Sequence, residues 1–143
     1  MRILILNGPN LNLLGHREPA LYGHRSYVEL CKLIEAHAAG KGIQVAFLQS
    51  NHEGALIDAI QQAEGAYDGI IINPGAYAHY SYAIHDALLS VRVPAVEVHI
   101  TDIAAREPWR QVLVTAPACR AMIAGHGLAG YCEAVDALET LLC

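Results

Sequence analysis

The strongest constraint on the fold is a regular alternation between short apolar runs and longer segments with helical periodicity. Five runs rich in Ile, Val, Leu and Ala are expected to be strands: Arg2–Leu6, Ile43–Leu48, Gly69–Ile72, Ala95–Ile100 and Arg120–Ala124. Near-continuous apolar runs are typical of parallel sheets, because helices cover both faces of such a sheet. The alternation therefore predicts an α/β protein rather than a helical bundle or a β-sandwich.

The segments between these runs predict helices, and three of them carry N-terminal capping signals. Ser26 and Glu29 have the spacing of a capping box, and so do Ser50 and Glu53. Ser81 stands at the start of a third amphipathic segment, and a final helical pattern follows the last apolar run.

The order of elements and the length of 143 residues favour a single domain over residues 1–143. With five strands, we expect a flavodoxin-like, doubly wound parallel sheet in the order 2-1-3-4-5, with helices on both faces. The connection after the first strand is unusually long and rich in Gly and Pro. Long connections in compact domains commonly form lids, so residues 11–25 are expected to be an active-site lid.

Composition limits the partners and the compartment. The net charge of -5 argues against a general nucleic-acid binder. The apolar N-terminus is too short for a signal peptide, and no stretch approaches the roughly 20 apolar residues of a membrane span. Charged residues are only 16% of the chain, which suggests that other copies cover part of the surface. We expect a cytoplasmic homo-oligomer without nucleic-acid or membrane partners.

Polar residues follow nearly every predicted strand. In open α/β sheets, ligands bind outside the carboxyl ends of the strands. The polar clusters at these ends are Asn7–Asn12, Gln49–His52, Asn73–Gly75 with His79, Glu97–Thr101 and Gly125–Gly127. Five clusters at one edge predict a ligand site there.

Several kinds of chemistry are disfavoured by what these loops contain. No P-loop and no GxGxxG motif follows a strand, and the four cysteines lack the spacing of a zinc site. The only lysines, Lys32 and Lys41, lie on or just after the first predicted helix, away from the strand ends that a Schiff-base lysine would have to reach. A flavin- or nucleotide-binding module remains an alternative, because the same fold can host one.

Two pairs of residues suggest acid–base chemistry. Glu97 and His99 are two apart on a strand and share a face, so they could ligate a metal or form an oriented general acid. The second interpretation is favoured because no third ligand is evident. Arg17 and Tyr22 lie in the long connection, where a guanidinium could favour a tyrosinate base. From their spacing alone, two solvated loop residues are the favoured interpretation.

Taken together, these stretches resemble the type II dehydroquinases, the 3-dehydroquinate dehydratases of the shikimate and quinate pathways. The resemblance covers almost the whole chain. Its motifs are Leu6–Gly15, Arg17–Pro19, Tyr22-Gly23, Gln49–Gly54, Ile72–Tyr77 with His79, Glu97–Ile100, Arg106–Pro108 with Arg110, and Gly127–Tyr131.

The resemblance implies anti elimination of water from 3-dehydroquinate through an enolate, without a cofactor or a metal. Tyr22 matches the general base and Arg17 the residue that activates it. Asn10 matches the residue that holds a water against the enolate oxygen. His99 matches the general acid, and Glu97 its orienting neighbour.

The resemblance also implies a set of substrate-binding positions: Asn73, His79, Asp86, Ile100, Thr101 and Arg110. Among these, Asp86 matches a residue that reaches the site of a neighbouring subunit. The family assembles trimers into dodecamers, so the same assembly is expected here.

Overall fold

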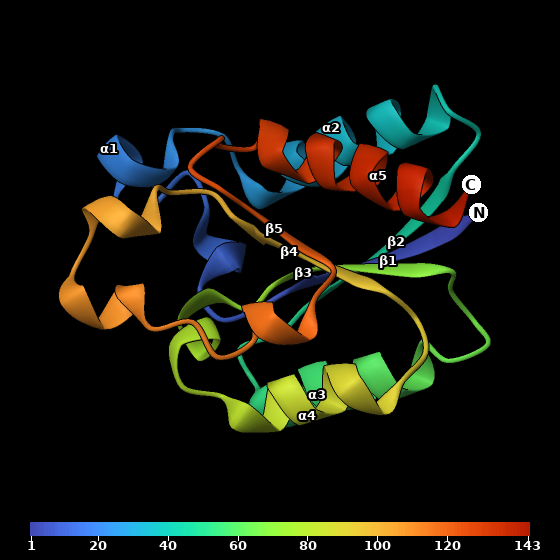
Figure 1. The fold of residues 1–143 in the computed structure, drawn as a ribbon. Helices are drawn as coiled ribbons and strands as arrows, with labels where there is room; N and C mark the ends of the chain where they lie inside the picture. The colour runs from blue at the N-terminus through green and yellow to red at the C-terminus, as the bar shows by residue number, and fades with distance from the viewer.

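Five parallel strands form one sheet in the order β2-β1-β3-β4-β5, which confirms the predicted topology (Figure 1). The computed structural model describes all residues 1–143. The strands are β1 (Arg2–Asn7), β2 (Gln44–Gln49), β3 (Gly69–Asn73), β4 (Ala95–His99) and β5 (Ala121–Ala124). Each begins and ends within a residue or so of the predicted run.

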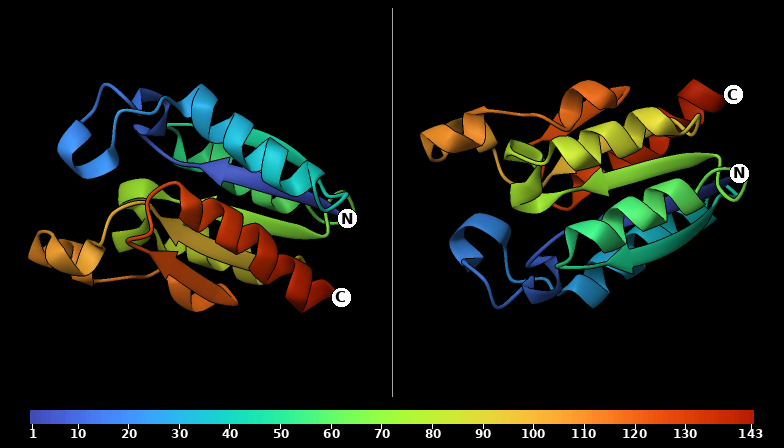
Figure 2. Two further views of the ribbon diagram at one scale, coloured as in Figure 1. Left: turned by 90° about the horizontal axis from the view of Figure 1, so that it is seen from above. Right: turned by 90° about the horizontal axis from the view of Figure 1, so that it is seen from below.

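Helices cover both faces of the sheet, as the two views from above and below show (Figure 2). On one face lie α2 (Tyr27–Ala39) and α5 (Ala129–Leu142), and on the other lie α3 (Glu53–Gln62) and α4 (Tyr82–Ser90). None of the helices combines the length and the apolar composition needed to cross a lipid bilayer.

The connections contain short helical turns. They are η1 (Leu11–Leu13), α1 (Pro19–Tyr22), η2 (Gly75–His79), η3 (Ile103–Ala105), η4 (Pro108–Gln111) and η5 (Ala116–Ala118). The connection between β1 and α2 therefore has local structure of its own, and its first part is anchored by the buried Leu11 and Leu14.

The sheet separates two hydrophobic clusters, and the pleat decides which residue joins which. Ile3 and Ile5 of β1 belong to the cluster under α2 and α5, whereas Leu4 and Leu6 belong to the cluster under α3 and α4. Because side chains alternate along a strand, the next residue, Asn7, follows the α2/α5 side. On β4, Val96 and Val98 belong to the α2/α5 cluster, so Glu97 and His99 lie on the opposite face.

Two of the three predicted caps are confirmed. Ser26 Oγ accepts from Glu29 N at 3.2 Å while Glu29 Oε2 accepts from Ser26 N at 2.6 Å, and Ser81 Oγ caps α4. The second capping box is wrong. Helix α3 begins at Glu53, so this residue is in the first helical position and not the third, and Ser50 Oγ accepts from His52 N instead.

Candidate active site

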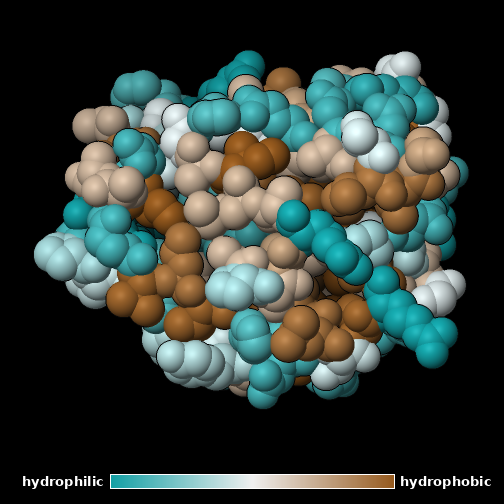
Figure 3. Space-filling view, in the orientation of Figure 1, coloured by the Kyte–Doolittle hydropathy of each residue, from teal (hydrophilic) through white to brown (hydrophobic).

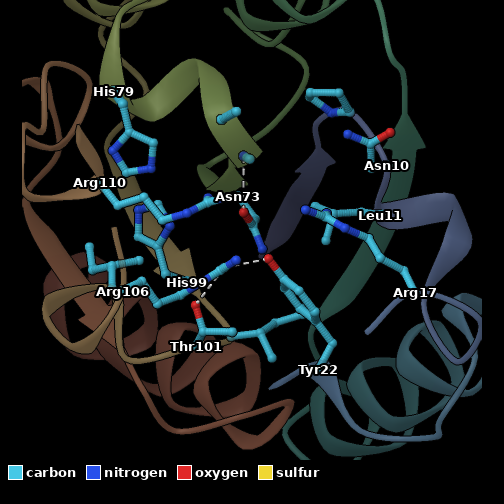
Figure 4. A pocket seen from close by; sticks show the side chains of 15 residues that line it. Asn10, Leu11, Arg17, Tyr22, Asn73, His79, His99, Thr101, Arg106 and Arg110 are labelled. Carbon is cyan, nitrogen blue, oxygen red and sulfur yellow. Dashed lines mark hydrogen bonds between the residues drawn. The ribbon is translucent and has the colours of Figure 1, made fainter. Parts of the chain in front are cut away.

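A small cavity opens at the carboxyl edge of the sheet, between the loops that follow β1, β3 and β4 (Figure 4). Its polar and charged lining side chains are Asn10, Arg17, Tyr22, Asn73, His79, His99, Thr101, Arg106 and Arg110. The lining contains three arginines and no carboxylate, in a protein whose net charge is -5. This arrangement favours a small anionic ligand.

Two guanidinium groups surround Tyr22. Arg106 Nη1 donates a hydrogen bond to the Tyr22 hydroxyl at 2.6 Å. The Arg17 guanidinium carbon lies over the ring face, 4.7 Å from the ring centroid. The Arg106 side chain is only 7% exposed, and the nearest carboxylate oxygens, from Glu18 and Glu107, are each 3.9 Å from its Nη2. A nearly buried cation therefore donates a charge-assisted hydrogen bond directly to the phenol oxygen.

The predicted Glu97–His99 pair is formed at the end of β4. Glu97 Oε1 lies 2.6 Å from His99 Nε2, and Glu97 is completely buried. Because a carboxylate can only accept, this contact places a proton on Nε2 and leaves Nδ1 as the ring nitrogen free for a ligand. His99 lines the cavity, whereas Glu97 lies behind it.

His79 is held beside His99 by the backbone. Its Nδ1 donates to the Val112 carbonyl oxygen at 2.8 Å, and its ring lies 6.2 Å from the His99 ring and 5.3 Å from the Trp109 ring. Burial lowers the pKa of His79 below its ordinary value, and this outweighs the opposing effect of the Val112 carbonyl. A neutral His79 with its proton on Nδ1 offers Nε2 as a hydrogen-bond acceptor.

Three asparagines lie at or just after the ends of β1, β2 and β3, and two of them, Asn10 and Asn73, line the cavity. Asn10 has a left-handed backbone with φ of 70°, and its N–H donates to Asn51 Oδ1 at 3.0 Å. Asn73 Oδ1 accepts from Gly75 N at 3.1 Å, and its Nδ2 donates to the buried Tyr131 hydroxyl at 2.9 Å. These bonds fix the Asn51 and Asn73 amides and the backbone of Asn10 before a ligand binds.

The turn after β4 provides unused backbone donors. Neither the Ile100 nor the Thr101 N–H donates to a backbone carbonyl, and both residues line the cavity. The Thr101 hydroxyl accepts from Arg106 Nη1 at 3.4 Å. Two free N–H groups and a nearby guanidinium form a cradle suited to a carboxylate.

Nine of the eleven residues predicted for the site line this cavity, and Glu97 contacts it through His99. Asp86 does not reach it: its side chain is 81% exposed on α4, and its carboxylate contacts only His85. Arg110 lines the cavity while its Nε donates to Glu107. Of the predicted polar clusters, those after β2 and β5 do not line the cavity, although Asn51 supports Asn10 from behind.

Three residues that contact the site were given no role from the sequence. Arg106 was recognised within a motif only, yet it is the group that binds the Tyr22 hydroxyl. Thr115 and Tyr131 support Glu97 and Asn73 from outside the cavity. A run of polar residues after a strand could reveal none of them, because all three are placed by tertiary contacts. No group of three or more His, Cys, Asp and Glu side chains is close enough to hold a metal ion.

The comparisons with known proteins agree with this geometry. Residues 1–139 match the family described as Dehydroquinase class II. The chain is 53% identical to a 3-dehydroquinate dehydratase from Lachnoclostridium phytofermentans, over 99% of this chain and 98% of the relative. It superimposes on a type II dehydroquinase from Butyrivibrio crossotus with a TM-score of 0.96 and 52% identity, covering 97% of each chain. A second such structure, from Propionibacterium acnes, gives a TM-score of 0.91 at 40% identity, covering 99% of this chain and 95% of the other.

The chain therefore belongs to the class II dehydroquinase family, as its motifs indicated. The alternative of a flavin- or nucleotide-binding module is not favoured by these comparisons.

Proposed function

We propose that the protein dehydrates 3-dehydroquinate to 3-dehydroshikimate, a step of the shikimate pathway. One observation carries the proposal: a phenol bound to a nearly buried guanidinium and a carboxylate-paired imidazole line the same cavity. The first supplies a base and the second an acid, which are the two groups that loss of water from a hydroxy ketone requires. The family membership and the named relatives support the same reaction.

Tyr22 acts as the base in this proposal. The phenolate oxygen removes the proton next to the ketone, and the electron pair of the broken C–H bond moves to form the enolate. Arg106 donates to the Tyr22 oxygen and Arg17 lies over the ring, so two guanidinium groups are placed to bind the oxygen and the ring of the base. Asn10 holds a water against the enolate oxygen, where negative charge develops.

His99 acts as the acid in the second half of the reaction. Its Nδ1 gives a proton to the departing hydroxyl as the enolate collapses and the carbon–oxygen bond breaks, so water leaves. For this step the ring carries a proton on Nδ1 as well as on Nε2, and the buried Glu97 carboxylate, 2.6 Å from Nε2, fixes its orientation. No lysine lines the cavity, so this mechanism forms no Schiff base.

The remaining lining residues bind the substrate. The free N–H groups of Ile100 and Thr101 receive its carboxylate, together with the Asn73 amide. His79 and Arg110 lie beside His99, across the cavity from Asn10 and Arg17, and bind the ring hydroxyls (Figure 4). Residues 11–25 act as a lid over this site within one catalytic domain of residues 1–143. Gly15 and Gly23, which have φ of 88° and 81°, flank the part that carries Arg17 and Tyr22.

A dehydratase assay tests the function directly. The purified protein is mixed with 3-dehydroquinate, and the enone absorbance of the product is followed. We expect Tyr22→Phe to lower kcat by about 10²–10⁴-fold, because a positioned base is lost. Tyr67→Phe is the matched control: this residue precedes β3 at the opposite edge of the sheet and has no hydroxyl hydrogen bond. Absence of enone formation by the wild-type protein would refute the function, and near-normal turnover of Tyr22→Phe would refute the tyrosinate assignment.

The exposed Asp86 supports a shared site in a homo-oligomer of trimers that assemble into a dodecamer. Its side chain is too far from its own cavity to line it, so in this proposal it completes the site of an adjacent subunit. Large apolar side chains are exposed, among them Leu89, Met122 and Leu141, and Figure 3 shows apolar patches on one face of the molecule.

Complementation between two inactive variants tests the shared site. Tyr22→Phe and Asp86→Ala are co-expressed after each has been shown to fold and to have low activity alone. Mixed oligomers can contain sites with an intact Tyr22 from one chain and an intact Asp86 from another. Activity above the weighted mean of the parents is expected. Simple averaging, with mixing demonstrated, would contradict the shared site.

A further inference from the structure

Both oxygens of the buried Glu97 carboxylate are bonded, one on each side. Oε1 contacts His99 Nε2 at 2.6 Å, and Oε2 accepts from the Thr115 hydroxyl, also at 2.6 Å. Glu97 and Thr115 have no solvent exposure, and His99 is 5% exposed. The three side chains form one chain of hydrogen bonds that runs from the interior to the cavity.

The Thr115 hydroxyl does not cap the helical turn that follows it. Thr115 is the N-cap residue of η5, where a Thr side chain commonly accepts from a backbone N–H of the first turn. Here the side chain caps nothing, and its hydroxyl points to Glu97 instead. The turn is closed by the backbone, since the Thr115 carbonyl accepts from Ala118 N at 3.0 Å. The side chain is therefore not required to close the turn.

No other group competes for this oxygen of Glu97. Cys119 is the titratable neighbour from the η5 side, and burial raises the pKa of its thiol, so it stays neutral. His79, on η2, also feels Glu97, but burial lowers its pKa and its Nδ1 is bonded to Val112. Thr115 is the single donor to Oε2, and without it this buried oxygen is unsatisfied.

We propose that Thr115 is a positioning residue for the acid: its hydroxyl locks the Glu97 carboxylate in the rotamer that holds His99 with Nε2 protonated and Nδ1 facing the cavity. The effect on catalysis rests on the proposed function, whereas the effect on the imidazole does not. Without the hydroxyl, Glu97 can rotate away from Nε2, and His99 loses both its fixed orientation and its fixed tautomer. Buried, fully bonded polar networks of this kind define geometry more strongly than their separate bonds.

Kinetics of a double-mutant cycle test whether Thr115 acts through Glu97. Thr115→Val is expected to lower kcat about 10- to 100-fold, less than loss of the acid itself, with KM changed by less than about threefold. Thr115→Ser, which keeps the hydroxyl, is expected to restore kcat. In a Glu97→Gln background, Thr115→Val should have an effect of less than about twofold, because the two residues form one unit. Equal factors in both backgrounds, or full activity of Thr115→Val, would overturn the proposal.

A second measurement separates this inference from the proposed reaction. In protein labelled with ¹⁵N-histidine, the His99 signals are assigned by their loss in His99→Gln, and the tautomer of the neutral ring is read from the nitrogen shifts. Wild type and Thr115→Ser should show the Nε2–H form, and Thr115→Val a mixture with the Nδ1–H form.

The matched control for both measurements is Thr140→Val, which removes a hydroxyl bonded to a backbone carbonyl on α5. It should leave the tautomer and kcat unchanged. An unchanged tautomer in a folded Thr115→Val would overturn the positioning role whatever reaction the protein performs. If wild type lacks dehydratase activity but the tautomers respond as expected, the proposed function fails and the positioning role stands.

Discussion

Removal of the Tyr131 hydroxyl is expected to destabilise the protein strongly. Tyr131 lies on α5 and is fully buried; its hydroxyl donates to Asn7 Oδ1 at 2.6 Å and accepts from Asn73 Nδ2 at 2.9 Å. Burial raises the pKa of this hydroxyl, so the group remains a neutral O–H that can donate and accept at once. It therefore joins α5 to the ends of two adjacent strands, since Asn7 and Asn73 are in register.

The magnitude follows from the two amides that Tyr131→Phe would leave behind. Asn7 is 0% and Asn73 is 4% exposed, so water cannot replace the lost partner. Each buried polar group left unsatisfied costs about 1–3 kcal/mol, which gives about 2–6 kcal/mol for the pair. Asn7 Nδ2 already has no partner, so in the variant no side-chain atom of Asn7 would be bonded. The loss is large beside the usual 5–15 kcal/mol of total domain stability.

Urea unfolding at one fixed protein concentration measures this effect, since association between copies would otherwise shift the midpoint. Tyr67→Phe is the control, because it removes a hydroxyl without a hydrogen bond while keeping the ring next to Arg2. We expect a much lower midpoint for Tyr131→Phe and a change within about 0.5 kcal/mol for the control. Equal midpoints for the two variants would show that the hydroxyl bridge contributes nothing to stability.

Three further predictions follow from the contacts of the site. Arg106→Gln should lower kcat about 10- to 100-fold, because the charge-assisted bond to Tyr22 is lost; steady-state rates near wild type would contradict this. Borohydride added with substrate should cause no inactivation and no mass addition, since Lys32 is on the exposed side of α2 and Lys41 is bound to Glu139 and Asp136; substrate mass trapped on either lysine would contradict the mechanism. Because burial lowers the pKa of His79, the unfolded chain takes up a proton first as the pH falls through about 6.5, and stability is lost there. Urea midpoints at about pH 7.5 and 5.5 should differ less in His79→Gln than in wild type, and equal differences would exclude this contribution.

The fold was predictable because its signals are local. Apolar runs such as Gly69–Ile72 and caps such as Ser26 are written within a few residues, and rules for parallel connections then fix the strand order. The capping box at Ser50 failed because the sequence pattern does not reveal where the first turn closes. The start of the helix was assigned two residues too early, and the true N-cap, His52, has no side-chain capping hydrogen bond.

The candidate site was predictable where its residues follow strands directly, as Asn73 and His99 do. It was less predictable where two irregular connections meet. Arg106 reaches Tyr22 across 84 residues of sequence, and Thr115 reaches Glu97 from a turn that has no apolar periodicity. Such pairings depend on how loops fold over the sheet, and neither spacing nor hydrophobic pattern contains that information. For Asp86, the pattern gives its place on α4, and the structure of one chain shows that its side chain is exposed and does not line its own cavity.

Because side chains alternate along a strand, the residues that hold the site's side chains in place lie on both faces of the sheet, in two separate hydrophobic layers. Asn73 is anchored through Tyr131 to the α2/α5 layer, whereas the Glu97–His99 pair is anchored through Thr115 on the other face. The two layers share no side chains across the sheet, so a repacking of one leaves the other's anchor in place. During divergence, each half of the site can thus accumulate and compensate substitutions on its own. A single inserted residue in β4 is the exception, because it would turn Glu97 and His99 to the opposite face and disconnect both from Thr115.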